Sequence, residues 1–333
     1  FPPAPKEIPG GEDKKAASVV SVVTPEASIA EMKEELSLPS AVKGTPGDLK
    51  INPTERKITL ENDLFRLVLN SAGGKIEKFE LKNFKKEPHP GSENILLVDA
   101  ADPSLGTLST IGKGALGFPG DPLYDFAGLE NQYLVSGNEE TALIFRTVHN
   151  QLLLEKVYRF SGNKYAFFMD IRVTNQSGDT LNGSLDTLLV QPFDESMKGN
   201  RFTFVGAATL FDDKLETDSV EDIEKKPATY SGNVGWSGFE DKYFFKAVVP
   251  LDERKTDVLV QMENSVFLNQ ISEKPILALQ PGASAQYGYL VYFGPRDLEI
   301  LKSVGHRLEA VVDFGYFDII ARPLLSVLKF FYG

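Results

Sequence analysis

A glycine motif in the first half of the chain has the spacing of a dinucleotide-binding loop. Residues 112–117 (GKGALG) match the pattern G-x-G-x-x-G. That chemistry needs a helix to begin at the third glycine, so that the helix N-terminus meets the pyrophosphate. Residues 118–122 (FPGDP) follow here, and their prolines exclude such a helix. We therefore predict a flexible loop and no nucleotide cofactor.

The other residue types that often carry catalysis are scattered. The three histidines, His89, His149 and His306, form no short metal-binding spacing. Residues 235–239 (GWSGF) approach the G-x-S-x-G elbow of serine hydrolases and fail at its last glycine. Paired carboxylates for glycoside chemistry stay open, because the fold and not the spacing sets their separation. We predict no catalytic residues, no metal and no cofactor.

Three aromatic residues could bind a ligand without catalysis. Trp236, with Tyr243 and Phe244 nearby, could stack on a sugar. Such residues more often fill a core. The acidic run over residues 212–224 lacks the order of a calcium loop. We interpret it as a solvated loop, with a partner contact as the less favoured alternative.

Composition limits the possible partners. The chain has 333 residues, no cysteine and a net charge of −12. The acidity and the lack of a basic cluster exclude a typical nucleic-acid binder. It also disfavours broad adsorption to anionic lipid. Without cysteine there is no disulfide or thiolate chemistry. The first residue is Phe, so we expect a processed or excised piece, with any spanning helix outside it.

The elements that must position these residues are mostly strands. Residues 1–53 carry eight prolines and predict a flexible linker. From residue 57 the apolar residues alternate, most clearly over 165–174. The predicted strands also include residues 65–69, 76–81, 142–148, 153–160, 185–191, 243–249, 258–262 and 286–293. Regular strands with turn signals and almost no helix predict an all-β sandwich over residues 54–294. Residues 99–131 predict a long loop.

Helix is predicted only at the end of the chain. An apolar stripe over residues 295–313 indicates a helix packed on the sandwich, with Pro295 in its first turn. Residues 314–333 are strongly apolar with a narrow polar stripe, which favours an amphipathic helix in a membrane interface over a buried core helix. The predicted interface residues are Phe314, Tyr316, Phe317, Ile320, Arg322, Leu324, Leu325, Leu328, Lys329 and Phe331.

The last third of the chain carries a family resemblance. The motifs are residues 235–236 (GW), 242–247 (KYFFKA), 292–295 (YFGP), 312–317 (VDFGYF), 321–325 (ARPLL) and 328–329 (LK). Looser matches are residues 73–76 (GGKI), 156–160 and 204–208 (FVGAA). Together they resemble the large periplasmic domain of the bacterial YidC membrane-protein insertases, between their first two transmembrane helices.

The resemblance implies both fold and function. It implies a β-supersandwich similar to galactose-mutarotase-like folds, at the periplasmic face of the inner membrane. The implied role is non-catalytic assistance to insertion and folding of membrane proteins, in the manner of a chaperone. The implied partners are Sec translocon accessory subunits, nascent membrane proteins and the membrane surface. Arg322 matches the interfacial helix, not the arginine of the insertase groove. A carbohydrate-binding or mutarotase-like module is the alternative, and a groove for unfolded segments is a third.

Overall fold

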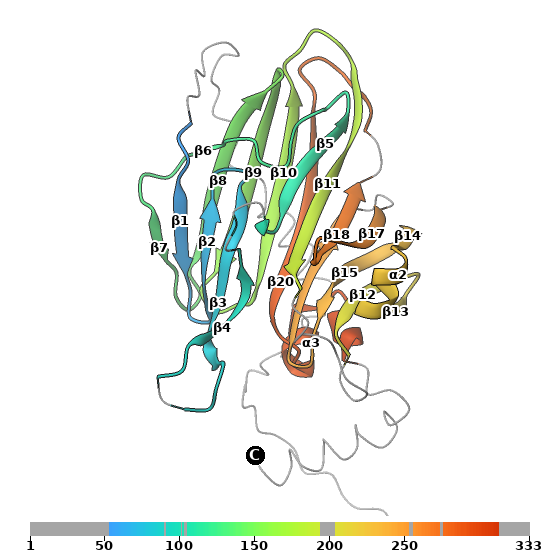
Figure 1. Cartoon of the computed structure of the whole chain (residues 1–333). Coiled ribbons are helices and arrows are strands. Elements are labelled where there is room, and N and C mark those ends of the chain that lie inside the picture. The colour runs from blue at the N-terminus through green and yellow to red at the C-terminus, as the bar shows by residue number, and fades with distance from the viewer. Residues whose placement is uncertain are drawn as a thin grey trace, which may run out of the picture. The chain divides into compact units, whose positions relative to one another are not determined.

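The computed structural model describes residues 53–89, 91–100, 102, 105–193, 204–252, 256–273 and 276–312 (Figure 1). Strands dominate this part of the chain, which confirms the prediction of a mainly β fold. The predicted linker, apart from Pro53, and the predicted interface helix over residues 314–333 lie outside the described residues. The strands form three sheets.

The first sheet has five strands in the order β4-β3-β2-β1-β7. Its strands are β1 (Lys57–Glu61), β2 (Phe65–Asn70), β3 (Lys75–Lys85), β4 (Asn94–Asp99) and β7 (Gln132–Leu134). The pairings are antiparallel except that β7 runs parallel to β1. Every second residue of β1 and β2 is buried, because alternate side chains of a strand point to opposite faces.

The second sheet has nine strands in the order β13-β12-β15-β16-β20-β10-β9-β8-β6. Its strands are β6 (Asp125–Phe126), β8 (Glu140–His149), β9 (Leu152–Ser161), β10 (Ala166–Asn175), β12 (Gly206–Phe211), β13 (Lys214–Ser219), β15 (Val234–Glu240), β16 (Phe244–Pro250) and β20 (Ser284–Pro295). The last strand in the sequence, β20, pairs with β10 on one side and with β16 on the other.

The third sheet has six strands, in the order β14-β17-β18-β11-β19, with β5 also paired to β11. Its strands are β5 (Ser109–Gly114), β11 (Leu181–Pro192), β14 (Ala228–Gly232), β17 (Thr256–Glu263), β18 (Val266–Glu273) and β19 (Ile276–Leu279). The helical elements of the described chain are α2 (Val220–Lys225), α3 (Leu298–Val304) and the 3-10 turn η3 (Leu308–Val311).

Aromatic side chains fill the space between the sheets. Phe65 of β2 and Phe79 of β3 lie 4.5 Å apart between ring centroids, and Phe79 meets Phe293 of β20 at 5.3 Å. Phe239 of β15 packs on Phe267 of β18 at 4.6 Å. These contacts join the nine-stranded sheet to each of its neighbours, and edge-to-face aromatic pairs add to the apolar burial that drives the packing.

Three predicted loops contain regular structure instead. The long loop predicted over residues 99–131 contains β5 and β6. The glycine motif over 112–117 overlaps the end of β5, and no helix follows it. The acidic run forms β13 and α2, whose Val220 and Ile223 are buried. The acidic run lacks an alternating apolar pattern because β13 is an edge strand that is partly exposed on both faces. Charged side chains are common on such edge strands.

The C-terminal helix also differs from its prediction. Pro295 is the last residue of β20, opposite Phe244, and does not start a helix. Asp297 caps α3 instead, because its Oδ1 accepts hydrogen bonds from the backbone N–H groups of Glu299 (2.9 Å) and Ile300 (3.0 Å). Gly305, with φ +82°, ends α3, and η3 follows as a separate turn. The expected helix over 295–313 is thus two short pieces. Leu301, Leu308 and Val311 still point into the core.

Candidate functional site

The predicted stacking platform does not form. Trp236 is fully buried in the core, where its ring meets Phe245 edge-on at 5.2 Å. Its Nε1 donates a hydrogen bond to the backbone oxygen of Arg307 (3.3 Å). Trp236 therefore closes the joint between β15 and the C-terminal segment, and it has no face to offer a sugar. The prediction that Trp236 binds a ligand is wrong, because its side chain fills the core.

Tyr243 and Phe244 lie elsewhere, at the turn between β15 and β16. Asp241 Oδ1 accepts hydrogen bonds from the N–H groups of Tyr243 and Phe244, both at 2.7 Å. This local cap fixes the turn. Tyr243 is 61% exposed, whereas Phe244 is half-buried against Phe84 at 5.3 Å.

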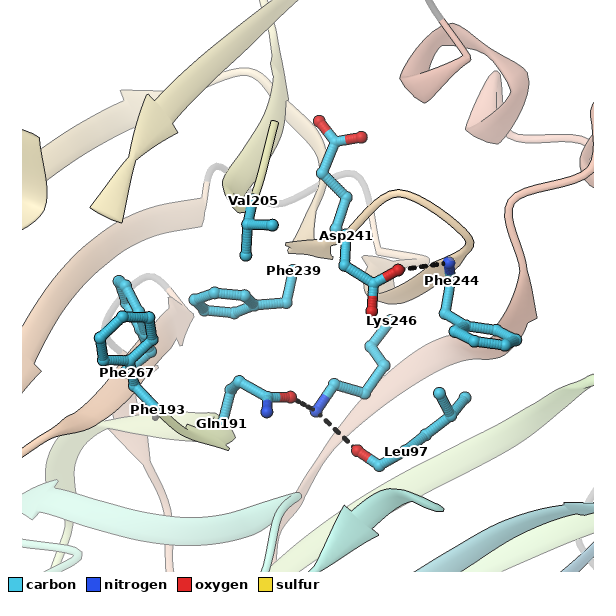
Figure 2. Close-up of a pocket in the computed structure, with 10 residues that line it drawn as sticks. Leu97, Gln191, Phe193, Val205, Phe239, Asp241, Phe244, Lys246 and Phe267 are labelled. Atoms are coloured by element: carbon cyan, nitrogen blue, oxygen red, sulfur yellow. Dashed lines mark hydrogen bonds between the residues drawn. The ribbon is translucent and has the colours of Figure 1, made fainter. Parts of the chain in front are cut away.

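A small pocket opens beside this turn. Its cavity measures about 30 Å³. It is lined by Leu97, Gln191, Phe193, Val205, Phe239, Glu240, Asp241, Phe244, Lys246 and Phe267 (Figure 2). Pockets for small-molecule ligands typically measure about 300 Å³ or more. The cavity therefore has room for about one water molecule and none for a sugar ring.

Lys246 supplies the buried cation of the pocket. Its Nζ donates to the backbone oxygen of Leu97 (3.1 Å) and to Oε1 of Gln191, as Figure 2 shows. Burial lowers the pKa of the Lys246 amine to about 7, with the carboxylate of Asp241 opposing the shift. An amine with such a pKa could exchange protons near neutrality. Its known partners are backbone and amide oxygens, which makes it a cross-link between β16, β4 and β11.

The acidic residues of the pocket are engaged too. Glu240 is buried, and its Oε2 lies 3.0 Å from Nη2 of Arg296. The same guanidinium donates through Nε to the backbone oxygen of Val311 (3.1 Å). Arg296 therefore clamps the end of η3 to the rim of the pocket. This arrangement positions the chain as it leaves the sandwich, and it holds no acid–base pair facing open space.

A second buried lysine sits at the Gly73–Gly74 corner. Lys156 of β9 donates through Nζ to the backbone oxygens of Leu108 and Gly73, the latter at 3.5 Å. Tyr158 donates its hydroxyl to the oxygen of Gly74 (2.7 Å). Burial lowers the pKa of the Lys156 amine to about 7, helped by the nearby charge of Lys75.

The sequence analysis does not predict that Lys156 and Lys246 are buried. Both residues stand there only as parts of family motifs. A usable signal existed, because Lys246 interrupts the apolar run FFKAVV, and Lys156 takes one place in an alternate series that is otherwise apolar or aromatic, namely Leu152, Leu154, Tyr158 and Phe160. A cation on the apolar face of a strand is buried and must therefore find oxygen partners.

The described residues contain no group of side chains suited to a metal ion. His89 is exposed and contacts Glu87 (2.8 Å between Nε2 and Oε2), His149 ends β8, and His306 lies exposed between α3 and η3. Within the described part of the chain, no helix is long and apolar enough to cross a membrane.

Comparison with known proteins gives a consistent family. The family described as the YidC periplasmic domain matches residues 57–327. The chain is 35% identical to a membrane protein insertase YidC of Geotalea uraniireducens over 283 residues, which are 85% of this chain and 53% of that protein. It is 32% identical to the same-named protein of Geotalea daltonii, over 100% of this chain and 61% of that protein. The chain thus spans little more than half the length of these relatives.

Solved structures with similar folds were also found. A galactose mutarotase related enzyme from Lactobacillus acidophilus is 12% identical, with a TM-score of 0.48, over 71% of this chain and 97% of that one. A putative aldose 1-epimerase from Escherichia coli K12 is 10% identical, with a TM-score of 0.48, over 73% and 100%.

Proposed function

Because the chain belongs to the YidC periplasmic domain family, part of inner-membrane insertases, we propose that it is a non-catalytic contact domain. It assists the insertion and folding of inner-membrane proteins. Its contacts are with accessory subunits of the Sec translocon or with the membrane proteins being inserted. The periplasmic face of the inner membrane is where it works.

One observation carries this proposal. The family match begins at residue 57, which is the first residue of β1, and it runs past the end of η3. The whole described sandwich is therefore the family's domain. The chemistry of the pocket agrees with a contact role, because its charged side chains are engaged within the domain: Lys246 binds Leu97 and Gln191, and Glu240 pairs with Arg296. The cavity is also far smaller than a substrate site.

The membrane part of the proposal rests on residues 314–333. The predicted interface residues begin two positions after Val312, where the described chain ends. The Arg296–Val311 hydrogen bond supports this reading, because it fixes the point from which that segment departs. The carbohydrate alternative gains nothing from the structure, since Trp236 is buried.

Flotation with liposomes tests the anchor. We expect the full chain to float with vesicles and a version ending at Asp313 to stay at the bottom of the gradient. If neither floats, residues 314–333 do not bind the membrane.

Contact with partners is tested in membranes that hold the complete insertase. A photo-crosslinker at exposed positions such as Glu216 and Leu129 should capture translocon accessory subunits or a nascent membrane protein from at least one face. A domain that captures neither would contradict the contact role.

A further inference from the structure

Two turns meet at one end of the sandwich and carry a row of aromatic side chains. The row consists of Phe84 at the end of β3, Phe244 at the start of β16 and Tyr243 in the β15–β16 turn. Phe84 and Phe244 lie 5.3 Å apart edge-on, and Phe244 and Tyr243 lie 6.4 Å apart. Exposure rises along the row, from the half-buried phenylalanines to the 61% exposed tyrosine. The row therefore ends in solvent.

The exposed end of the row is held rigidly and has a cationic neighbour. The two hydrogen bonds to Asp241 fix the backbone of Tyr243 and Phe244. Lys242 places its Nζ 4.7 Å from the centre of the Tyr243 ring. A tyrosine with an adjacent lysine is the combination that suits a membrane–water boundary, where the ring sits among headgroups and the amine reaches the water.

This end is also where the described chain departs. The backbone N–H of Arg296 donates to the oxygen of Tyr243 (2.7 Å), and the side chain of Arg296 binds the oxygen of Val311. Arg296 thus contacts both Tyr243 and Val311. Val311 is followed by Val312, and the apolar residues 314–333 come soon after it in the sequence. In Figure 1 the β3–β4 hairpin and α3 lie toward the same end of the molecule.

Local charge permits approach to lipid. The chain as a whole is acidic, with a net charge of −12, which opposes contact with anionic membranes. In the two turns the charges balance, since Lys85, Lys86 and Lys242 are matched by Glu87, Glu93 and Asp241. The two turns therefore carry no net charge that would oppose their approach to the headgroups.

We infer that the aromatic row, Phe84, Phe244 and Tyr243, is a second membrane contact, seated on the headgroup region of the bilayer beside the point where the chain leaves the sandwich. The inference rests on the proposed membrane anchoring and deepens it. It assigns the orientation of the sandwich, with the β3–β4 and β15–β16 turns toward the lipid and the start of β1 away from it.

The absence of native cysteine allows a direct test with the full chain. A single cysteine carrying an environment-sensitive fluorophore is placed by Asn83→Cys, Leu129→Cys or Phe331→Cys. Asn83 is exposed and adjoins Phe84 without belonging to the row. Leu129 is the matched control, since it is 97% exposed in the loop held by Arg56 before β1. Strands β1 and β3 run in the same direction, so this loop lies at the opposite end of the sheet from Phe84.

The vesicles are phosphatidylcholine with a headgroup nitroxide lipid as a shallow quencher. We expect quenching at positions 83 and 331 and none at 129. Quenching at 331 but not at 83 overturns the second contact and leaves the anchor intact. No quenching at either site overturns both. Quenching at 83 that requires other subunits of the insertase identifies a protein partner and overturns the lipid assignment.

A variant then tests whether the row contributes affinity. Tyr243→Ser in the otherwise native chain should weaken vesicle binding about threefold, because a partly exposed ring no longer leaves water. Leu129→Ser should leave binding unchanged. Binding of Tyr243→Ser equal to that of the native chain would show that the row merely lies near the bilayer, and it would overturn a contact.

Discussion

The corner around Lys156 and the pocket around Lys246 each contain a buried lysine amine, but the packing around the two amines differs. In both places a lysine on a central strand crosses to backbone oxygens of another sheet segment, and burial lowers its pKa to about 7. At the corner the amine is enclosed by the Gly73–Gly74 turn and by Tyr158. At the pocket a cavity of about 30 Å³ adjoins the amine. The buried amine therefore braces the sheets in both places, and the packing around it decides how much stability a substitution costs.

Truncation should separate the two regions most strongly. We expect Lys156→Ala to lower the free energy of unfolding by about 3 kcal/mol, because it leaves a closed cavity and carbonyls without donors. We expect Lys246→Ala to cost about half of that, because water can enter from the adjoining pocket and bind the freed oxygens. Urea unfolding at pH 8 measures both. Equal losses would show that the pocket gives no access to water.

The glycine at the corner tests how tight that corner is. Gly73 has φ +83°, and a Cβ there would lie 2.8 Å from the backbone oxygen of Gly120. Gly282 has a similar φ of +76° with nothing within 4 Å of a Cβ. We expect Gly73→Ala to cost about 2 kcal/mol and Gly282→Ala about 1 kcal/mol, the difference being the steric contact alone. If thermal unfolding gives the two variants the same loss, the corner yields more easily than its geometry implies.

The free energy of unfolding should depend on pH in the same direction through both lysines. The ordinary pKa of a lysine is 10.5, and it is about 7 for Lys156 and Lys246 in the folded chain. Between those values the unfolded chain binds protons that the folded chain does not, so stability rises as pH increases from 7 toward 10.5. Below pH 7 both states are protonated and this contribution no longer changes.

The expected slope is about 1 kcal/mol per pH unit for each lysine. Unfolding of the native chain, Lys156→Met and Lys246→Met between pH 8 and 9.5 measures it. Each substitution should remove about half of the slope. An unchanged slope in Lys156→Met would mean that its amine stays protonated in the corner.

The smallest effect should come from filling the pocket. Val205 lines the cavity, so Val205→Ile should be neutral or raise the stability by less than about 1 kcal/mol. Val260, fully buried in β17, is the matched control, and its change to Ile should cost about 1 kcal/mol by overpacking. Thermal unfolding compares the two. A loss at Val205 as large as that at Val260 would mean that the cavity is not spare volume.

Much of the sheet structure could be predicted because it alternates. The pattern over residues 165–174 became β10, and each strand named from alternation lies within or overlaps a strand of the structure. Strands without an apolar period were missed, as with β13, whose residues KLETDS face water. Its hairpin did leave a signal. Residues 212–213 have φ of 48° and 62°, as do 150–151 and nearly so 264–265, and Asp and Asn favour such turns.

The candidate site was harder to predict, because its geometry depends on contacts between distant residues. Trp236 and Tyr243 are close in sequence, yet one closes the core against Arg307 and the other points to solvent. Nothing in the local pattern distinguishes those environments. The partners of Lys246 come from β4 and β11, which lie 149 and 55 residues away in sequence. Spacing cannot reveal contacts at that separation.

The place of β20 in the nine-stranded sheet has a consequence for the order of folding. Strands β6, β8, β9 and β10 form one group, and β12, β13, β15 and β16 form another, and β20 alone joins the two groups by hydrogen bonds. β20 ends at Pro295, so the sheet cannot close until almost the entire domain has been delivered. Hairpins can form as they emerge, but the long-range closure comes late. A domain that crosses a membrane from its N-terminus onward therefore keeps its nine-stranded sheet in two separate groups of strands until its last strand arrives.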